Sequence, residues 1–317
     1  MRRVVITGAG TINALGRDVP QTLAALREGR SAIGPLDIRD ADRLAIRIGA
    51  QVQGYDETAH FNRQQIALFD RYTQFALIAA GEAIGQAFQF VRAGLADVMV
   101  TGGSEAMLCF GGVKAWEGLR VMSHDTCRPF CATRTGMVQG EGAGVFVLEA
   151  YDHARARGAE VLAEVAGVAM TSDASDIVMP SRQGAERAMT GALRDAGLDP
   201  SDIGYINAHG TGTSANDKTE CAAVAHVFGP QADRLAISST KSMHGHCIGA
   251  TGAIELLACL MALREGVIAP TANWVEPDPE CALDIVPNEA REARVTACLS
   301  NAFAFGGMNA VLALKAA

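Results

Sequence analysis

The chain has 317 residues, of which 49% are hydrophobic and 20% charged, and its formal net charge is −8. This length suits two packed halves of one globular protein, and the apolar fraction excludes general disorder. The acidic balance argues against a general nucleic-acid binder, which needs a basic surface. A small basic patch that docks an acidic carrier protein remains compatible with it.

The cysteines and the apolar runs of the sequence indicate in which cellular compartment the protein is expected. There are eight cysteines and no CxxC spacing, so we do not expect a disulfide scaffold in a chain of this size. The apolar run after Arg3 is too short for a signal peptide, and the stretch 258–263 is too short to span a bilayer. We therefore expect a cytoplasmic protein with no membrane span.

The first predicted elements are a strand and a long helix. A β-branched run at 3–8 ends in glycine, which predicts a buried strand. The glycines that follow do not have the spacing of the dinucleotide fingerprint, so we favour a turn over a nucleotide site. Residues 68–93 then predict one helix, which Gly81 and Gly85 interrupt.

After residue 94 the predicted elements are short and alternate in type. We predict strands at 95–103, 140–148, 160–170, 205–207, 235–238, 295–299 and 309–314, and helices at 149–158, 184–196, 218–228 and 250–264. Strands that alternate with helices place the chain in the α/β class.

Three glycine-flanked segments, 207–213, 239–246 and 300–307, each follow or end a predicted strand. Loops after the carboxyl ends of strands are where α/β proteins place their chemistry. Two histidines in these segments, His209 and His246, could converge as neutral donors on one oxygen and stabilise an enolate or oxyanion. The helix predicted near residue 250 follows His246, and its N-terminus disfavours the imidazolium form.

Other interpretations of these residues stay open at this stage. Lys241 and Glu255 could form a buried pair that fixes this corner, and His209 could be a structural histidine. A metal site could form from His244, His246 and Cys247, but their spacing fits no standard zinc pattern. The histidines on predicted helices, at 153 and 226, are interpreted as structural.

These three segments, together with 125–130 and 176–181, resemble the β-ketoacyl-acyl carrier protein synthases, the decarboxylating condensing enzymes of the thiolase-like fold. The motifs resemble the synthase II branch and, within it, the nodulation E subgroup. The resemblance covers essentially the whole chain from Arg3 onward, apart from one join. It implies an α/β, layered αβαβα fold of two similar halves, 1–157 and 158–317, with no cofactor and no metal.

The resemblance also implies roles for individual residues. Family members load an acyl group onto a cysteine, decarboxylate malonyl-carrier protein, and let the enolate attack the acyl thioester. His209 and His246 resemble the pair that holds the malonyl thioester oxygen. Lys241 resembles the lysine that orders the site, and Glu255 its partner. The remaining positions lie in one loop. Phe303 resembles the gating aromatic residue whose backbone N–H contributes to the oxyanion hole, and Asn301, Gly306 and Gly307 resemble the residues that shape this loop.

The nucleophilic cysteine of the family is missing from this sequence. Residues 84–94 resemble the body of the nucleophile's helix, whereas 71–83 resemble a much earlier helix, so the N-terminal half is predicted to be truncated near 81–85. Neither Cys109 nor Cys247 lies in a nucleophile motif. Cys131 and Thr135 replace acidic residues of most relatives, which we interpret as a subgroup feature.

These observations lead to three hypotheses. The chain is by descent a condensing enzyme of fatty acid, polyketide or nodulation-lipid synthesis, with acyl carrier protein, malonyl and acyl thioesters and a homodimer as its partners. Alternatively, it is a non-catalytic subunit, like a chain-length factor, that forms a heterodimer with a full-length ketosynthase, or it is an inactive remnant. Condensation by this chain alone is not expected, but slow decarboxylation by the histidine pair is.

Overall fold

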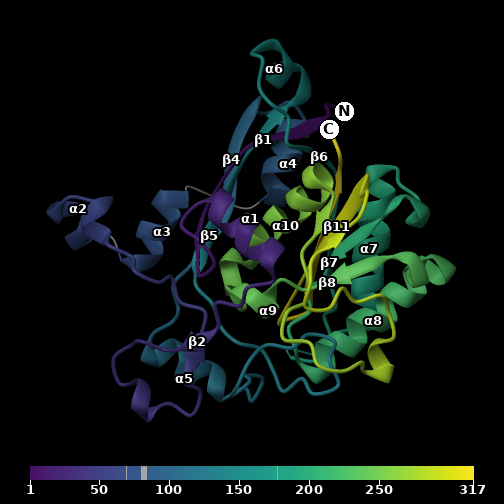
Figure 1. Cartoon of the computed structure of the whole chain (residues 1–317). Coiled ribbons are helices and arrows are strands. Elements are labelled where there is room, and N and C mark those ends of the chain that lie inside the picture. The colour runs from purple at the N-terminus through teal and green to yellow at the C-terminus, as the bar shows by residue number, and fades with distance from the viewer. Residues whose placement is uncertain (69, 80–83, 177) are drawn as a thin grey trace.

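The computed structural model describes residues 1–68, 70–79, 84–176 and 178–317. Its main feature is an eight-stranded sheet of order β4-β5-β1-β6-β12-β11-β7-β8 (Figure 1). The strands are β1 (Val4–Asn13), β2 (Gly34–Pro35), β3 (Ile48–Gly49), β4 (Val98–Glu105), β5 (Gly142–Ala150), β6 (Ala163–Ser172), β7 (Tyr205–Asn207), β8 (Ala236–Ser238), β9 (Val267–Ile268), β10 (Arg291–Glu292), β11 (Ala297–Ala304) and β12 (Met308–Lys315). The helices are α1 (Val19–Glu28), α2 (Arg63–Leu68), α3 (Arg71–Ala79), α4 (Ile84–Arg92), α5 (Phe110–Glu117), α6 (Tyr151–Ala156), α7 (Arg182–Ala196), α8 (Ser214–Phe228), α9 (Lys241–His244) and α10 (Thr251–Glu265).

The order of the strands shows that the two halves of the chain share one topology. The first strand of each half, β1 and β6, pair antiparallel at the centre of the sheet. The last strands, β5 and β12, lie outside them, and the penultimate strands, β4 and β11, come next. Beyond β11 the sheet continues in parallel with β7 and β8, whereas in the described residues β4 is an edge strand. The N-terminal wing of the sheet is therefore two strands shorter than the C-terminal wing.

Helix α10 forms the central layer between the two wings (Figure 1). Its residues are apolar around the whole circumference, which is typical of a helix buried on all sides, and Ala253–Leu263 are all buried. On β5, Phe146 packs in the same cluster as Leu256 of α10. Its neighbour Val145 packs with Phe75 of α3, on the opposite face, as the two-residue period of a strand requires. Helix α7 covers the outer side of β6 and β12, so the layers run α-β-α-β-α.

The structure confirms the expected α/β class, the two similar halves and most predicted elements. The predicted helix 149–158 begins at Tyr151, because Glu149 and Ala150 still pair with β1. The predicted helix 68–93 corresponds to the last residue of α2 and to α3 and α4. Residues 81–83 of the predicted join near 81–85 lie outside the described residues, as does Ile177 of the 176–181 motif. Helices α1, α2, α5 and α9 were not predicted.

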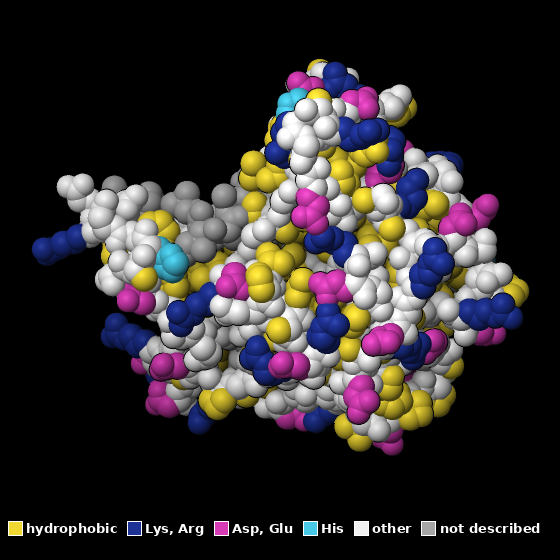
Figure 2. All heavy atoms as spheres, turned by 45° about the horizontal axis from the view of Figure 1, so that its top comes forward, with side chains coloured by type: hydrophobic (Ala, Val, Ile, Leu, Met, Phe, Trp, Pro, Cys, Tyr) yellow, Lys and Arg dark blue, Asp and Glu magenta, His cyan; other side chains and the backbone are white. Residues whose placement is uncertain are grey.

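On the face that Figure 2 shows, basic and acidic side chains are interspersed, and neither sign of charge forms a large patch. The segment with α2 projects from the side of the body, and α6 rises above it (Figures 1 and 2). Within the described residues, no helix is both long enough and apolar enough to cross a bilayer.

Candidate active site

Three parallel strands bring the glycine-flanked segments together. Strand β11 pairs with β7 through Ser300 and Asn207, and β7 pairs with β8 through Asn207 and Ser238. Their carboxyl ends meet at one edge of the C-terminal wing, so the three loops that follow lie side by side. The backbone therefore brings the three segments together.

His209 and His246 face each other across this site. Their ring centroids are 5.5 Å apart with the ring planes nearly perpendicular, at 84°. The ring of Phe303 lies 5.8 Å from that of His209. His209 is buried and His246 is half-buried. The structure thus brings both predicted histidines and the predicted aromatic together.

Both imidazoles are held in the neutral form. Burial is the main cause that lowers the pKa of His209 and of His246 well below the usual histidine range, and the nearby charge of Lys241 lowers both further. A neutral imidazole donates one hydrogen bond without carrying a charge of its own. This is the form that a donor to a developing oxyanion needs at neutral pH.

The tautomer of His246 follows from its backbone contacts. The N–H of Ile248 donates to Nδ1 of His246 at 3.1 Å, and since a backbone N–H can only donate, Nδ1 is the unprotonated nitrogen. The Thr251 hydroxyl lies 3.0 Å from the same Nδ1 and donates to it as well. The ring proton of His246 is therefore on Nε2. Ile248 makes this contact from a left-handed backbone with φ of 39°, a costly conformation for a β-branched residue.

Lys241 and Glu255 form the buried pair expected from the sequence. The Lys241 Nζ lies 2.5 Å from Oε1 of Glu255, and both side chains are fully buried. Burial raises the pKa of Glu255 to about 7, and the Lys241 ammonium opposes that rise. Lys241 comes from α9 and Glu255 from α10, so the pair joins the loop of His246 to the central helix.

Glu220 of α8 is a site residue that the sequence reasoning missed. Its carboxylate accepts the backbone N–H of His209 at 2.9 Å and that of Gly210 at 2.8 Å. It also accepts the side-chain N–H of Asn301 at 3.1 Å, so one buried carboxylate ties two of the three loops together. One helical turn earlier, Asp217 accepts the N–H of Phe130 at 2.8 Å, and burial raises its pKa to about 6. Two acids three positions apart at the start of the helix after His209 are the signal that could have revealed this role.

The remaining predicted positions lie in the β11–β12 hairpin. Asn301 is buried, and Gly306 and Gly307 both have positive φ, 80° and 73°. A Cβ at Gly307 would come within 2.6 Å of Asp173, so the turn requires glycine there for space as well as for conformation. All eight predicted site residues are thus located around one edge of the sheet, and their catalytic roles stay predictions.

The hydrogen bonds of the cysteines do not mark any of them as a nucleophile for this site. Among the described residues, no cysteine sulfur is hydrogen-bonded to His209 or His246. Burial raises the pKa of Cys127 to about 12 and that of Cys247 well above its usual value. Cys109 is exposed at the N-terminus of α5.

The metal alternative does not fit the ring of His244. Its Nδ1 lies 2.7 Å from the Gly245 carbonyl, to which it donates, and its Nε2 lies 3.0 Å from the Thr240 hydroxyl. Burial lowers the pKa of His244 to about 3. Both ring nitrogens already have protein partners, so we assign His244 a structural role.

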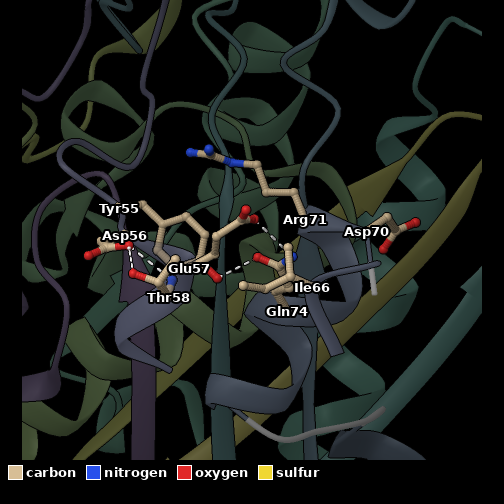
Figure 3. A pocket seen from close by; sticks show the side chains of 8 residues that line it. All are labelled: Tyr55, Asp56, Glu57, Thr58, Ile66, Asp70, Arg71 and Gln74. Carbon is tan, nitrogen blue, oxygen red and sulfur yellow. Dashed lines mark hydrogen bonds between the residues drawn. The ribbon is translucent and has the colours of Figure 1, made fainter. Parts of the chain in front are cut away.

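A cavity of about 610 Å³ lies elsewhere, between residues 55–58 and helices α2 and α3 (Figure 3). Gln74 spans it, accepting the Tyr55 hydroxyl at 2.6 Å and donating to Glu57 at 3.3 Å. Arg71 on the same side reaches the buried Glu141 at 2.6 Å. None of the predicted site residues lines this cavity.

Comparison with known proteins agrees with this geometry. The family pattern "Beta-ketoacyl synthase, N-terminal domain" matches residues 72–154, and "Beta-ketoacyl synthase, C-terminal domain" matches residues 162–275. Nodulation protein E of Rhizobium sp. (strain N33) is 42% identical over 399 aligned positions that cover 99% of each chain. The 3-oxoacyl-[acyl-carrier-protein] synthase 2 of Staphylococcus aureus (strain COL) is 33% identical, covering 99% of this chain and 98% of its own.

Among solved structures, the ishigamide ketosynthase/chain length factor superposes with a TM-score of 0.95 and 31% identity, covering 100% of this chain and 99% of its own. The layered fold is that of the thiolase-like ketosynthases. The chain belongs to the β-ketoacyl synthase family.

Proposed function

We propose that this chain carries out the decarboxylating part of β-ketoacyl synthase chemistry, acting on a malonyl thioester of acyl carrier protein. The observation that supports it most strongly is the His209–His246 pair, two neutral rings whose centroids are 5.5 Å apart. On this proposal, the Nε2–H of His246 and an N–H of His209 both donate to the thioester carbonyl oxygen. Fixed dipoles of this kind act most strongly on the charge that develops in the transition state.

The reaction needs no base and no nucleophile from the protein. The bond between the carboxylate carbon and Cα of the malonyl group breaks, and carbon dioxide leaves. The bonding electron pair moves to the thioester as an enolate, whose oxygen the two histidines hold. Protonation of Cα by water then gives the acetyl thioester. The backbone N–H of Phe303 is proposed as an additional donor at the same oxygen.

Condensation by the chain alone is not part of this proposal. It would require a thiol that holds the acyl group beside the histidine pair. No described cysteine sulfur is hydrogen-bonded to either histidine, and burial raises the pKa of Cys127 and Cys247. The pKa of Cys131 is lowered, but its sulfur bonds the Thr133 hydroxyl and the Glu276 N–H instead. The 399-position alignment with nodulation protein E is longer than the 317-residue chain, which supports an internal gap relative to that relative. The shorter N-terminal wing supports a gap before β4.

The names of the relatives support the substrate class. A 3-oxoacyl-[acyl-carrier-protein] synthase and nodulation proteins E are among them, so we propose acyl carrier protein as the partner and fatty acid, polyketide or nodulation-lipid synthesis as the setting. The halves 1–157 and 158–317 are proposed as its two structural units. The cytoplasmic location stays a prediction.

The test is release of carbon dioxide from malonyl-acyl carrier protein by the purified chain. We expect release above that of the His209→Ala and His246→Ala variants, each of which removes one donor, with circular dichroism to check that both variants are folded. Intact mass after incubation with acyl-acyl carrier protein is expected to show no added acyl group. A covalent acyl adduct would instead support the hypothesis that the chain is a condensing enzyme. Cys→Ser variants would then identify the acylated cysteine.

A second candidate function is a non-catalytic subunit that pairs with a full-length ketosynthase. The position of β4 as an edge strand within the described residues favours it. Val98 and Val100 are exposed there, and Leu95 just before the strand is exposed as well. One similar structure bears the name ketosynthase/chain length factor. Co-purification as a stable heterodimer, with no carbon dioxide release by this chain, would favour this function. Aggregation of the chain, whether it is expressed alone or together with a ketosynthase, would favour an inactive remnant.

A further inference from the structure

Gln139 has a buried side-chain amide without a hydrogen-bond partner. The residue is 1% exposed, and within the described residues neither its Oε1 nor its Nε2 is hydrogen-bonded. Among the buried side chains that the structure describes, it is the one in which two polar atoms lack a partner. Burial of an unpaired amide is unfavourable, and nearly all buried polar groups of folded proteins have a partner. An amide of this kind points to a ligand group that it contacts.

The backbone places this amide beside His246. The N–H of His246 donates to the Val138 carbonyl at 2.7 Å, and the N–H of Gly140 donates to the His246 carbonyl at 3.0 Å, so Gln139 and His246 form a parallel bridge pair. Paired residues of neighbouring strands lie about 4.8 Å apart and project their side chains to the same face. On its other edge, the Gln139 carbonyl accepts the N–H of Ala50 at 2.9 Å. The backbone of Gln139 is therefore fixed from both sides.

Two adjacent side chains thus present N–H donors without a protein partner. The Nδ1 of His246 is taken by the N–H of Ile248, which leaves the proton on Nε2. In the part of the chain that the structure describes, no hydrogen bond uses that Nε2–H. The Nε2–H groups of Gln139 are the second set of free donors. Because Met137, two positions before Gln139, belongs to an apolar cluster, the polar neighbour of the amide is His246.

The chemistry of a malonyl thioester fits this pair of donors. Its carboxylate is separated from the thioester carbonyl by one methylene group, so an oxygen held by His246 leaves the carboxylate close to the neighbouring side chain. The charge of Lys241 acts on the His246 ring, whereas Glu141 is compensated by Arg71 at 2.6 Å. An amide is also a suitable donor because it is neutral. A cation would hold the carboxylate more strongly in the ground state and oppose its loss as carbon dioxide.

We propose that Gln139 recognises the free carboxylate of the malonyl group through its Nε2–H. It is a substrate-contacting residue that selects carboxylated acyl thioesters over those without a carboxylate, such as the acetyl thioester. The inference deepens the proposed function and rests on it for the identity of the substrate. A hydrogen bond to a charged acceptor is strong enough to supply a preference of about tenfold in affinity.

The experiment uses acyl carrier protein loaded with a sulfoacetyl group, in which a sulfonate replaces the carboxylate and carbon dioxide cannot leave. Calorimetry compares its Kd with that of acetyl-acyl carrier protein. We expect the full-length parent chain to bind the sulfoacetyl form about tenfold more tightly, and Gln139→Met to bind both forms equally. Gln51→Met is the matched control, because the buried Gln51 amide already accepts the N–H of Asp37 at 2.6 Å. This control should keep the preference.

Urea unfolding separates this role from a structural one. Gln139→Met and Gln139→Leu remove an amide that has no partner, so both should raise the midpoint of unfolding. Gln51→Met removes a hydrogen bond that is made, so it should lower the midpoint. A lower midpoint for both Gln139 variants, or failure of both to fold, would overturn the proposal.

The binding data give the remaining outcomes. Equal binding of the sulfoacetyl and acetyl forms by the parent chain, or a preference that the Gln139 variants retain, would overturn the proposal as well. If the preference is lost in these variants but the parent chain releases no carbon dioxide from malonyl-acyl carrier protein, the recognition role stands and the decarboxylase function fails.

Discussion

The backbone N–H of Ile248 donates to Nδ1 of His246 at 3.1 Å, and this contact fixes which ring nitrogen carries the proton. The donor is presented by a residue with φ of 39°, a strained conformation that the short helical turn at Ile248–Ala250 and the start of α10 hold in place. Strain at such a position costs on the order of 1–3 kcal/mol and persists where the surroundings determine it. Here it gives the site a defined Nε2–H donor.

The histidine pair should not titrate near neutral pH. Burial and the Lys241 charge lower the pKa of both rings well below 6.5, so neither ring is expected to change its protonation between about pH 6 and 8. Nuclear magnetic resonance titration checks this directly. A measured pKa near 6.5 for either ring would contradict the neutral-donor mechanism.

The same lowered pKa values predict how stability depends on pH. In the unfolded chain these histidines take up protons below about pH 6.5, whereas in the folded chain they do not, so protonation favours unfolding. The stabilising contribution is fully present above pH 6.5 and decreases as the pH falls below it. His209→Gln should reduce this dependence in urea unfolding between pH 7 and 5. An identical dependence in the variant would show that His209 is protonated when folded.

Breaking the Lys241–Glu255 pair should be strongly destabilising. Lys241→Met leaves a fully buried carboxylate without its cation, and removal of one partner of a buried pair costs about 3–5 kcal/mol of unfolding free energy. The double variant Lys241→Met/Glu255→Leu removes both charges and should recover much of that loss. Urea unfolding of the three proteins measures it. A double variant less stable than the single one would argue against this account.

Glu220→Gln should disturb His209 through its backbone. The carboxylate accepts two backbone N–H groups and one Asn301 N–H, and an amide offers one oxygen and a donor instead of two acceptors. A buried N–H left without a partner costs about 1–3 kcal/mol. We expect that loss in urea unfolding together with slower carbon dioxide release. Unchanged release at reduced stability would restrict Glu220 to a structural role.

The adjacent glycines of the hairpin allow a matched comparison. Gly306→Ala and Gly307→Ala both place a Cβ at positive φ, which costs on the order of 1 kcal/mol. A Cβ meets nothing within 4 Å at Gly306 but comes within 2.6 Å of Asp173 at Gly307. The second variant should therefore lose more unfolding free energy and more activity. Equal losses would mean that Asp173 does not fix the loop.

Much of the scaffold could be predicted because its pattern is local. Strands such as β7 and β8 are short apolar runs between turn residues, and α10 is apolar throughout. The end of β5 was misassigned as helix because the charged run after Glu149 has helical character, and only pairing with β1 keeps Glu149 in the sheet. Helix α5, with three glycines in or next to it, has weak helical propensity and was not predicted.

The side chains of the candidate site could be predicted from the sequence, but the residues that hold them in place could not. His209, His246 and the Lys241–Glu255 pair could be recognised from sequence, since their residue types and loop positions suggest the chemistry. The role of Glu220 depends on which backbone groups its carboxylate accepts. The rings of Trp116 and Phe305, which stack on each other, belong to residues that are 189 positions apart in the sequence. Such contacts depend on how the two halves pack and are not local in the sequence.

The most direct test of the central claim is carbon dioxide release from malonyl-acyl carrier protein labelled at the free carboxyl group. The account predicts release by the parent chain that exceeds that of both His209→Ala and His246→Ala. Release equal in all three proteins, or absent from the parent chain while it is folded, would contradict the claim that this histidine pair acts on a malonyl thioester.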